Sequence, residues 1–259
     1  MTRTALVTGA ARGIGAATVT RLAADGWSVV AVDRVADDPR LPYAMASTNE
    51  LETVVAAAPG SVAVAADACD LAAMTDAVAT AEERFGGLDA VIAAAGVIAG
   101  GAPAWELAPE QEQAVLDIDL GGVLTTARAG IPALLRRPEP RTGRFVAVAS
   151  AAATRGLPML AAYCAAKAGV AGYVRALAAE LGASGVTANA VAPGSTDTAM
   201  LAESARLYGL PGAETFTAQQ PIGRLLKPDE VAAMIVWLAG EHAGGVTGAL
   251  VPVDGGLAV

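Results

Sequence analysis

Tyr163 and Lys167 have a spacing that suggests acid–base chemistry, because the lysine follows the tyrosine by four positions and Ser150 precedes it by thirteen. On a helix, one turn places such a pair on the same face. A phenol ionises at about pH 10, and a nearby ammonium favours the phenolate and lowers the tyrosine pKa. This tyrosine could pass a proton to or from an alcohol whose oxygen a serine hydroxyl holds. An ordinary helix could carry the same pair, so the rest of the chain must show whether Tyr163 and Lys167 form a catalytic site.

A glycine-rich segment near the start of the chain could bind a cofactor phosphate. Thr8-Gly9-Ala10-Ala11-Arg12-Gly13-Ile14-Gly15 follows an apolar run and opens a helical pattern. Glycines permit a tight turn and let backbone N–H groups approach a pyrophosphate at the positive end of the helix. A simple turn is the alternative, but this strand–turn–helix context favours dinucleotide binding.

Asp33 ends the second apolar run, where a carboxylate can bond the hydroxyls of an adenosine ribose. A 2′-phosphate there would meet like charge, which costs roughly 1–4 kcal/mol at about 4 Å. The sequence therefore favours NAD over NADP. Arg12 and Arg34 flank this position and could compensate a phosphate, although solvent-facing charge is our preferred interpretation of both.

Composition narrows the class of protein. A chain of 259 residues that is 54% apolar but only 4% aromatic predicts one large domain, residues 1–259, with a core of Ala, Val and Leu. The net charge of −9 argues against nucleic acid or an anionic membrane as partner. The single histidine, His242, excludes a Ser-His-Asp hydrolase and a histidine metal site, so no metal is expected.

The two cysteines, Cys69 and Cys164, are too few for a disulfide framework, so a reducing cytoplasm is the simplest compartment. The first apolar run starts at the N-terminus without a signal peptide, and no run of about 18 uninterrupted apolar residues follows. We therefore expect a soluble, cytoplasmic protein.

Short apolar runs alternate with longer helical patterns along the whole chain. Strands are expected at 5–7, 28–32, 62–66, 90–94, 144–149, 187–191 and 249–253, and helices near 13–25, 48–58, 71–86, 109–136, 161–182 and 228–240. The alternation predicts an α/β fold: a single-domain Rossmann fold whose doubly wound, seven-stranded parallel sheet has helices on both faces.

Two segments interrupt this alternation. Residues 34–58 form an insertion after the second strand, in which Ser47 and Glu50 have the spacing of a capping box. Residues 195–222 include a helical pattern at 199–207 and are interpreted as a substrate lid, with simple surface variation as the alternative. Met159, Leu160, Met200 and Leu201 would make the substrate pocket apolar, with packing in the core or the lid as the alternative. Trp105 either packs or borders the substrate.

The glycine loop, Ser150 and the Tyr163/Lys167 pair together resemble the short-chain dehydrogenase/reductase (SDR) family in its classical form. Further similar segments are Asn189-Ala190-Val191-Ala192-Pro193-Gly194, Pro221-Ile222-Gly223-Arg224, Val246-Thr247-Gly248 and Val253-Asp254-Gly255-Gly256. The resemblance covers essentially the whole chain and implies an NAD-dependent alcohol dehydrogenase or ketone reductase that forms a homotetramer. The helices near 109–136 and 161–182 would pack between subunits.

The resemblance also assigns roles to single residues. Ser150 would orient the substrate oxygen, Tyr163 would be the general acid/base, and Lys167 would bind the nicotinamide ribose. Asp67 would contact the adenine, and Thr198 would hold the carboxamide. The other positions that would line the cofactor are Gly9, Arg12, Gly13, Ile14, Gly15, Asp33, Ala95, Gly96, Pro193, Gly194 and Thr196.

Two positions depart from the family pattern. Ala93-Ala94-Ala95-Gly96 stands where the family usually has Asn-Asn-Ala-Gly, so another group must satisfy the backbone there. Asp119 stands where the family carries a catalytic asparagine. An ionised Asp119 near Tyr163 would oppose phenolate formation, so we predict that it is either protonated or paired with Lys167.

The insertion carries a finer resemblance. Leu41-Pro42-Tyr43-Ala44 and Asn49-Glu50-Leu51-Glu52-Thr53-Val54 are similar to the insertion of mycofactocin-associated SDRs, which recycle a tightly held NAD with a redox peptide cofactor. An ordinary variable loop is the alternative. Carveol dehydrogenases have similar insertions, which suggests a secondary, apolar or cyclic alcohol as substrate. Other open hypotheses are an SDR with freely exchanging NAD(P) that acts on acyl thioesters or sugars, and a non-catalytic NAD-binding protein.

Overall fold

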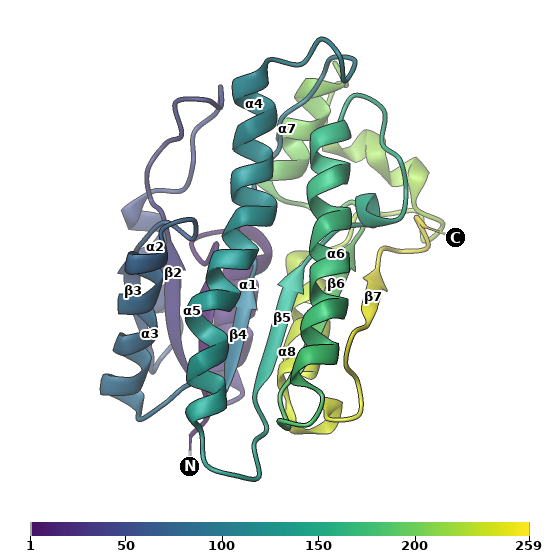
Figure 1. The fold of residues 1–259 in the computed structure, drawn as a ribbon. Coiled ribbons are helices and arrows are strands. Elements are labelled where there is room, and N and C mark those ends of the chain that lie inside the picture. Colours follow the sequence, from purple (N-terminus) through teal and green to yellow (C-terminus); the bar gives the residue numbers. More distant parts are fainter. Residues whose placement is uncertain (1, 259) are drawn as a thin grey trace.

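Seven short runs of mostly Val and Ala form one parallel sheet in the order β3-β2-β1-β4-β5-β6-β7 (Figure 1). The structure is a computed structural model and describes residues 2–258. The strands are β1 (Thr4–Thr8), β2 (Ser28–Asp33), β3 (Ser61–Ala65), β4 (Ala90–Ala93), β5 (Arg144–Val148), β6 (Thr187–Pro193) and β7 (Leu250–Val253). The five strands β1, β2, β4, β5 and β6 are buried almost throughout, which explains why they read as continuous apolar runs.

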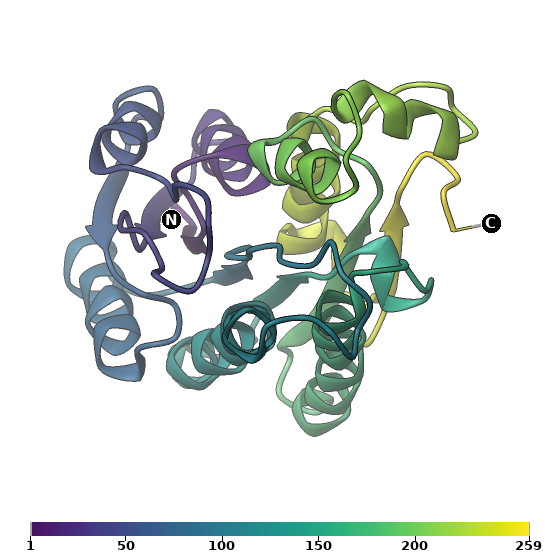
Figure 2. The same cartoon turned by 90° about the horizontal axis from the view of Figure 1, so that it is seen from above.

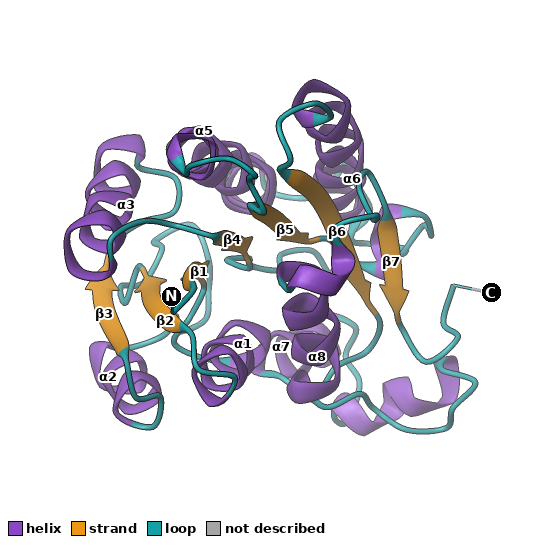
Figure 3. Cartoon of the chain, turned by 90° about the horizontal axis from the view of Figure 1, so that it is seen from below, coloured by secondary structure: helices purple, strands orange, loops and turns teal. Residues whose placement is uncertain are grey.

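Helices cover both faces of the sheet, as the sequence predicts (Figures 2 and 3). One face carries α1 (Gly13–Ala24), α2 (Thr48–Ala56) and α8 (Pro228–Ala239), and the other α3 (Leu71–Phe85), α5 (Gly122–Arg136) and α6 (Ala161–Leu181). Two separate apolar cores fill the space between the sheet and these two layers. α4 (Pro109–Val115) and α7 (Ala199–Leu207) lie beyond the carboxyl ends of the strands, at the top of Figure 1.

The helix expected at 109–136 is interrupted by a turn of π-helix, η1 (Leu116–Gly121). The helix expected over 109–136 is thus present, with this π-helical turn inside it. η1 carries Asp119, whose side chain is fully buried, and ends beside Gly122, where a Cβ would already contact the sulfur of Cys69. A π-turn adds one residue to a single turn of the helix. The apolar pattern on either side of it remains helical, so the hydrophobic periodicity of the sequence does not reveal the π-turn. π-turns of this kind are frequent at functional sites.

Among residues 2–258, the run Pro109–Arg136 is the one helix that is long and apolar enough, by length and composition, to cross a membrane. Half of its most apolar window is buried inside the fold. It packs against α3, α6 and β4, as a core helix does.

Thr8 satisfies backbone N–H groups of the Ala93–Gly96 segment. The Thr8 hydroxyl accepts from the N–H groups of Ala94 at 3.1 Å and Ala95 at 3.2 Å. A side chain at the end of β1 thus satisfies the backbone after β4 without an asparagine.

The insertion is tied to the rest of the fold by ionic contacts. Arg40 contacts Asp38 at 2.8 Å and Asp117 on η1 at 2.6 Å, and Arg34 contacts Asp38 at 2.9 Å. The hydrogen bonds from Arg40 are the main reason that the pKa of the buried Asp38 carboxyl lies well below its ordinary value. The capping box predicted at Ser47 and Glu50 is confirmed, with both reciprocal bonds present. The insertion therefore has a defined conformation.

Candidate active site

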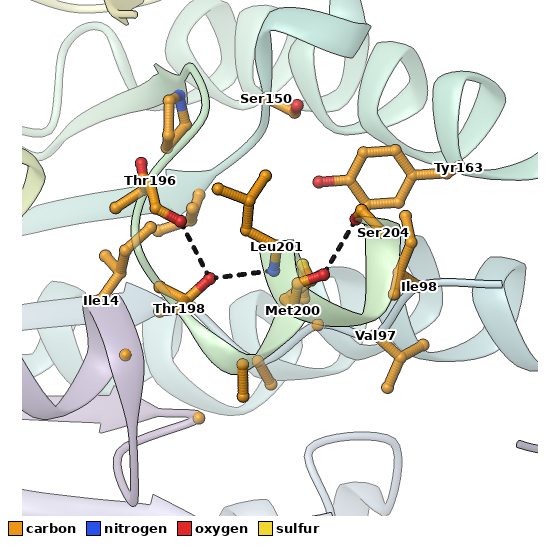
Figure 4. A pocket seen from close by; sticks show the side chains of 18 of the residues that line it. Ile14, Val97, Ile98, Ser150, Tyr163, Thr196, Thr198, Met200, Leu201 and Ser204 are labelled. Carbon is orange, nitrogen blue, oxygen red and sulfur yellow. Dashed lines mark hydrogen bonds between the residues drawn. The ribbon is translucent and has the colours of Figure 1, made fainter. Parts of the chain in front are cut away.

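A pocket of about 720 Å³ opens at the carboxyl ends of the strands and is lined by residues of both 34–58 and 195–222. Figure 4 shows part of its lining. Its lining includes every site residue expected from the sequence except Asp119, which is buried behind it: Gly9, Arg12, Gly13, Ile14, Gly15, Asp33, Asp67, Ala95, Gly96, Ser150, Tyr163, Lys167, Pro193, Gly194, Thr196 and Thr198. Residues that are far apart in the chain therefore meet in one cavity.

The glycine loop has the geometry of a phosphate cradle. Gly9 has φ +65°, and a Cβ there would lie 2.8 Å from the backbone of Ala94 and Ala95. A Cβ at Gly15 would overlap the carbonyl of Gly9. No side chain among residues 2–258 caps α1, whose N-cap is Arg12, so the N–H groups of its first turn stay available to an anion. These residues fit a dinucleotide.

Asp33 at the end of β2 and Asp67 just after β3 line the pocket near the glycine loop. Asp33 accepts from the N–H of Ala11 at 3.0 Å, which holds its carboxylate next to the glycine loop. Arg34 is paired with Asp38 and lies 3.5 Å from Asp67. Arg12 donates to the carbonyl of Ala44 in the insertion at 3.3 Å. Both arginines are partly exposed and line the pocket, and their contacts connect the insertion to it.

Ser150 follows the end of β5 by two residues, and Tyr163 and Lys167 lie on α6. Figure 4 shows the hydroxyls of Ser150 and Tyr163 facing one cavity, opposite Leu201 of the lid. The Ser150 hydroxyl also accepts from the N–H of Ala152 at 3.1 Å. The ammonium of Lys167 lies 5.6 Å from the centroid of the Tyr163 ring and donates to the Val148 carbonyl at 3.1 Å. The helical turn predicted for this pair is confirmed.

The carboxylate of Asp119 forms an ion pair with the ammonium of Lys167. One carboxylate oxygen accepts from the N–H of Val97 at 2.7 Å, and the other lies 3.4 Å from the Lys167 ammonium. Both side chains are almost completely buried, with exposed fractions of 0% for Asp119 and 4% for Lys167. The second half of our prediction, that Asp119 is paired with Lys167, is confirmed.

Comparison with known proteins agrees with this geometry. Residues 9–258 match the family described as "Enoyl-(Acyl carrier protein) reductase". A cis-4-hydroxycyclohexanecarboxylate dehydrogenase of Sinomonas cyclohexanicum is 39% identical, with 98% of this chain and 96% of the relative covered. The short-chain reductase protein NovJ of Streptomyces niveus is 38% identical, with 97% and 92% covered. The chain belongs to the short-chain dehydrogenase/reductase family.

Solved SDR structures share the whole fold. The carveol dehydrogenase from Mycobacterium avium, solved in complex with NAD, superposes with a TM-score of 0.91 at 30% identity, and 98% of this chain and 97% of that chain are covered. The Rossmann fold expected from the sequence is thereby confirmed, and the oxidoreductase class follows from the family. Among residues 2–258, no group of three His, Cys, Asp or Glu side chains could hold a metal ion.

Burial and two neighbouring charges act on the pKa of Tyr163. Burial raises the pKa of Tyr163 above its ordinary value, while the Lys167 ammonium opposes the rise and the Asp119 carboxylate adds to it. The lowering of the Tyr163 pKa by Lys167 that the sequence predicts is therefore present. Lysine does favour the phenolate, but burial outweighs it and Asp119 offsets part of its effect.

We expect Asp119→Asn to move the alkaline limb of the activity profile to lower pH. Asp119 raises the Tyr163 pKa, so an uncharged amide should let that pKa fall, whereas the bond from Val97 can be kept by the amide oxygen. The maximal rate should change less than about tenfold. Rates measured from neutral to alkaline pH check this, and a hundredfold loss at every pH would show that the carboxylate does more than replace an asparagine.

The end of the pocket that residues 195–222 line contains several residues that the sequence did not single out. Leu160, Met200 and Leu201 line it as expected, together with Leu157, Tyr208, Phe216 and Leu257. Tyr43 of the insertion also lines the pocket, and its hydroxyl accepts from the N–H of Ile98 at 2.9 Å. The available signal for Tyr43 was its place in the Leu41–Ala44 segment of the insertion.

Two expectations for this end were wrong. Met159 is not among the pocket residues; it has φ +61°, and its carbonyl accepts from Gly101 instead. Trp105 is 84% exposed, so it neither packs in the core nor borders the substrate.

Proposed function

We propose that this SDR is an NAD-dependent oxidoreductase that interconverts a secondary alcohol and its ketone, with Tyr163 as general acid/base. The observation that carries the proposal is the convergence of Ser150, Tyr163 and Lys167 on the cavity that the glycine loop also lines. The apolar residues under the lid favour an apolar or cyclic substrate. Carveol dehydrogenase and the cyclohexanecarboxylate enzyme, both similar over nearly the whole chain, act on cyclic alcohols by name.

The chain's own residues account for the proton and for substrate alignment. When bound, the nicotinamide gives or takes the hydride at the substrate carbon. Ser150 holds the substrate oxygen in reach of Tyr163, and the tyrosine hydroxyl donates its proton in reduction or recovers it in oxidation. Lys167 stays charged because Asp119 and Tyr163 outweigh the effect of burial on its pKa. Its ammonium favours the phenolate at the moment when the proton has left.

NAD is the proposed cofactor because the carboxylate of Asp33 occupies the ribose end of the cradle. A 2′-phosphate there would meet this charge, and the nearby Arg34 already faces Asp38 and Asp67. The NAD complex of the carveol dehydrogenase supports this choice for a protein of the same fold.

We further propose that NAD is held tightly and is recycled in place by a redox peptide cofactor of the mycofactocin kind. The support is the insertion, whose Arg34, Ala36, Tyr43, Met45 and Ala46 line the pocket and whose Arg40 is fixed to Asp117. Such a cover would slow cofactor release. If the cover opens readily, NAD exchanges freely and the insertion is an ordinary variable loop.

The test is the nucleotide content of purified, extensively dialysed protein, released by denaturation and separated into NAD(H) and NADP(H). Near-stoichiometric NAD(H) is expected, with alcohol oxidation then driven by an artificial electron acceptor. Arg40→Gln should lose nucleotide on dialysis, whereas Arg21→Gln, which breaks an exposed pair with Asp229, should not. Bound NADP(H) would contradict the role of Asp33, and empty wild-type protein would contradict tight retention.

Reduction of acyl thioesters is the second candidate, favoured by the description of the matching family as an enoyl-(acyl carrier protein) reductase. The apolar pocket accepts an acyl chain, but Asp33 opposes NADPH. Comparing turnover of cyclic alcohols with reduction of an acetoacetyl thioester by either reduced nucleotide separates the two candidates.

We propose a homotetramer located in the cytoplasm. The support is the outward face of α6, where Ala161, Ala165, Ala168 and Gly172 are small and let another helix approach closely. Both cysteines are free thiols, as suits a reducing compartment. Light scattering on the purified protein measures the oligomeric state.

A further inference from the structure

Arg155 is a cation at the substrate end of the pocket that the proposed chemistry does not use. It lies on the loop between β5 and α6 and lines the same cavity as Ser150 and Tyr163. The other cations of the lining are engaged: Lys167 with Asp119, and Arg34 with Asp38. Arg12 lies at the glycine loop and contacts the insertion. Within residues 2–258, no carboxylate lies in salt-bridge range of Arg155.

The loop that carries Arg155 is fixed on both sides. The N–H of Leu157 donates to the sulfur of Cys164 at 3.4 Å, and Cys164 directly follows Tyr163 on α6. One terminal nitrogen of Arg155 donates to the carbonyl of Leu257, which also lines the pocket. The loop therefore keeps a fixed relation to the helix of the catalytic tyrosine. The remaining N–H groups of the guanidinium form no hydrogen bond within residues 2–258.

The neighbouring polar groups under the lid are committed to the protein. The Ser204 hydroxyl donates to the Met200 carbonyl at 2.9 Å, and the Tyr208 hydroxyl donates to the Pro158 carbonyl at 2.7 Å. The other lid-side residues of the lining are mostly apolar, among them Leu160, Leu201 and Phe216. The cavity thus has proton-transfer groups at one place, apolar walls, and a cation on its exposed rim.

We infer that the substrate is an anionic secondary alcohol or ketone, in which an apolar ring or chain separates the reacting carbon from a carboxylate bound by Arg155. The inference rests on the proposed function of the same site. A guanidinium can bind a carboxylate with two parallel hydrogen bonds, which also fixes the direction of the substrate. The net charge of −9 does not oppose this, because charges farther than about 8 Å away are largely screened at physiological ionic strength.

The first test compares kcat/KM for 4-hydroxycyclohexanecarboxylate with that for its carboxamide, in the wild type and in Arg155→Gln. The wild type should prefer the acid. Arg155→Gln should lower kcat/KM for the acid about tenfold, mainly through KM, and leave the carboxamide within about twofold. An equal loss for both compounds, or a wild type that prefers the carboxamide, would overturn the inference.

A second test is independent of turnover and therefore of the proposed function. Calorimetry would measure binding of unreactive cyclohexanecarboxylate to the NAD-loaded protein. Arg155→Gln should weaken it about tenfold, whereas Arg84→Gln, an exposed arginine on α3 away from the pocket, should have no effect. Equal binding by wild type and Arg155→Gln refutes the carboxylate site even if catalysis is found. Loss of turnover with every alcohol, together with retained Arg155-dependent binding, refutes the proposed reaction alone.

Discussion

Tyr163→Phe is expected to lower kcat for alcohol oxidation about 10²–10⁴-fold while nucleotide binding stays unchanged. The substitution removes only the hydroxyl that faces the cavity, and the buried ring keeps its packing against Val97, Ala166 and their neighbours. Without that hydroxyl, the alcohol proton has no acceptor within the site. Steady-state rates and nucleotide titration on the same preparation measure the two effects separately.

Tyr208→Phe is the matched control. Its hydroxyl also lies at the pocket but donates to the carbonyl of Pro158, so its removal should change kcat less than about threefold. Undiminished turnover by Tyr163→Phe would remove this residue from the proton path. A non-catalytic NAD-binding protein would show the same nucleotide affinity in both variants and no turnover in the wild type.

Local patterns were enough to predict the architecture. Each of the seven strands was located to within two residues at either end, because apolar runs bounded by glycine and polar residues mark buried parallel strands. The glycine loop, Ser150 and the Tyr163/Lys167 pair were also found from spacing. Their meeting in one pocket follows from the fold, since all of them lie at the carboxyl ends of strands.

What sequence could not predict depends on contacts between distant segments. The π-turn η1 was hidden because a helical pattern continues on both sides of it. Thr8 replaces the missing asparagine through bonds to residues 86 and 87 positions away. Arg40 reaches Asp117 over a separation of 77 positions. The direction of the Tyr163 pKa shift required knowledge of burial, which spacing does not supply.

η1 joins two of these features. Asp117 binds Arg40 of the insertion, and Asp119, two residues later, binds Lys167. The same turn therefore connects the insertion with the buried Asp119–Lys167 ion pair. In a chain whose family uses an asparagine at position 119, the aspartate makes the charge of Lys167 part of a buried pair. Variants of Lys167 and Asp119 can test how this buried pair affects stability and activity.

Lys167→Met is expected to destabilise the protein by about 3–5 kcal/mol and to reduce activity roughly a hundredfold or more. The variant leaves the carboxylate of Asp119 buried without its ammonium partner, and it removes the charge that favours the Tyr163 phenolate. Urea unfolding followed by circular dichroism measures the free energy of unfolding, and initial rates measure activity.

The double variant Asp119→Asn/Lys167→Met separates the two effects. It should regain most of the lost stability, because no buried charge is left unpaired, but it should not regain activity, because the ammonium is still missing. If Lys167→Met alone unfolds within about 1 kcal/mol of the wild type, Asp119 is protonated in the variant and neutralisation has relieved the cost of its burial. A double variant as unstable as the single one would mean that Lys167 stabilises the fold through its bond to the Val148 carbonyl and its packing, and the pairing with Asp119 would carry no net stability.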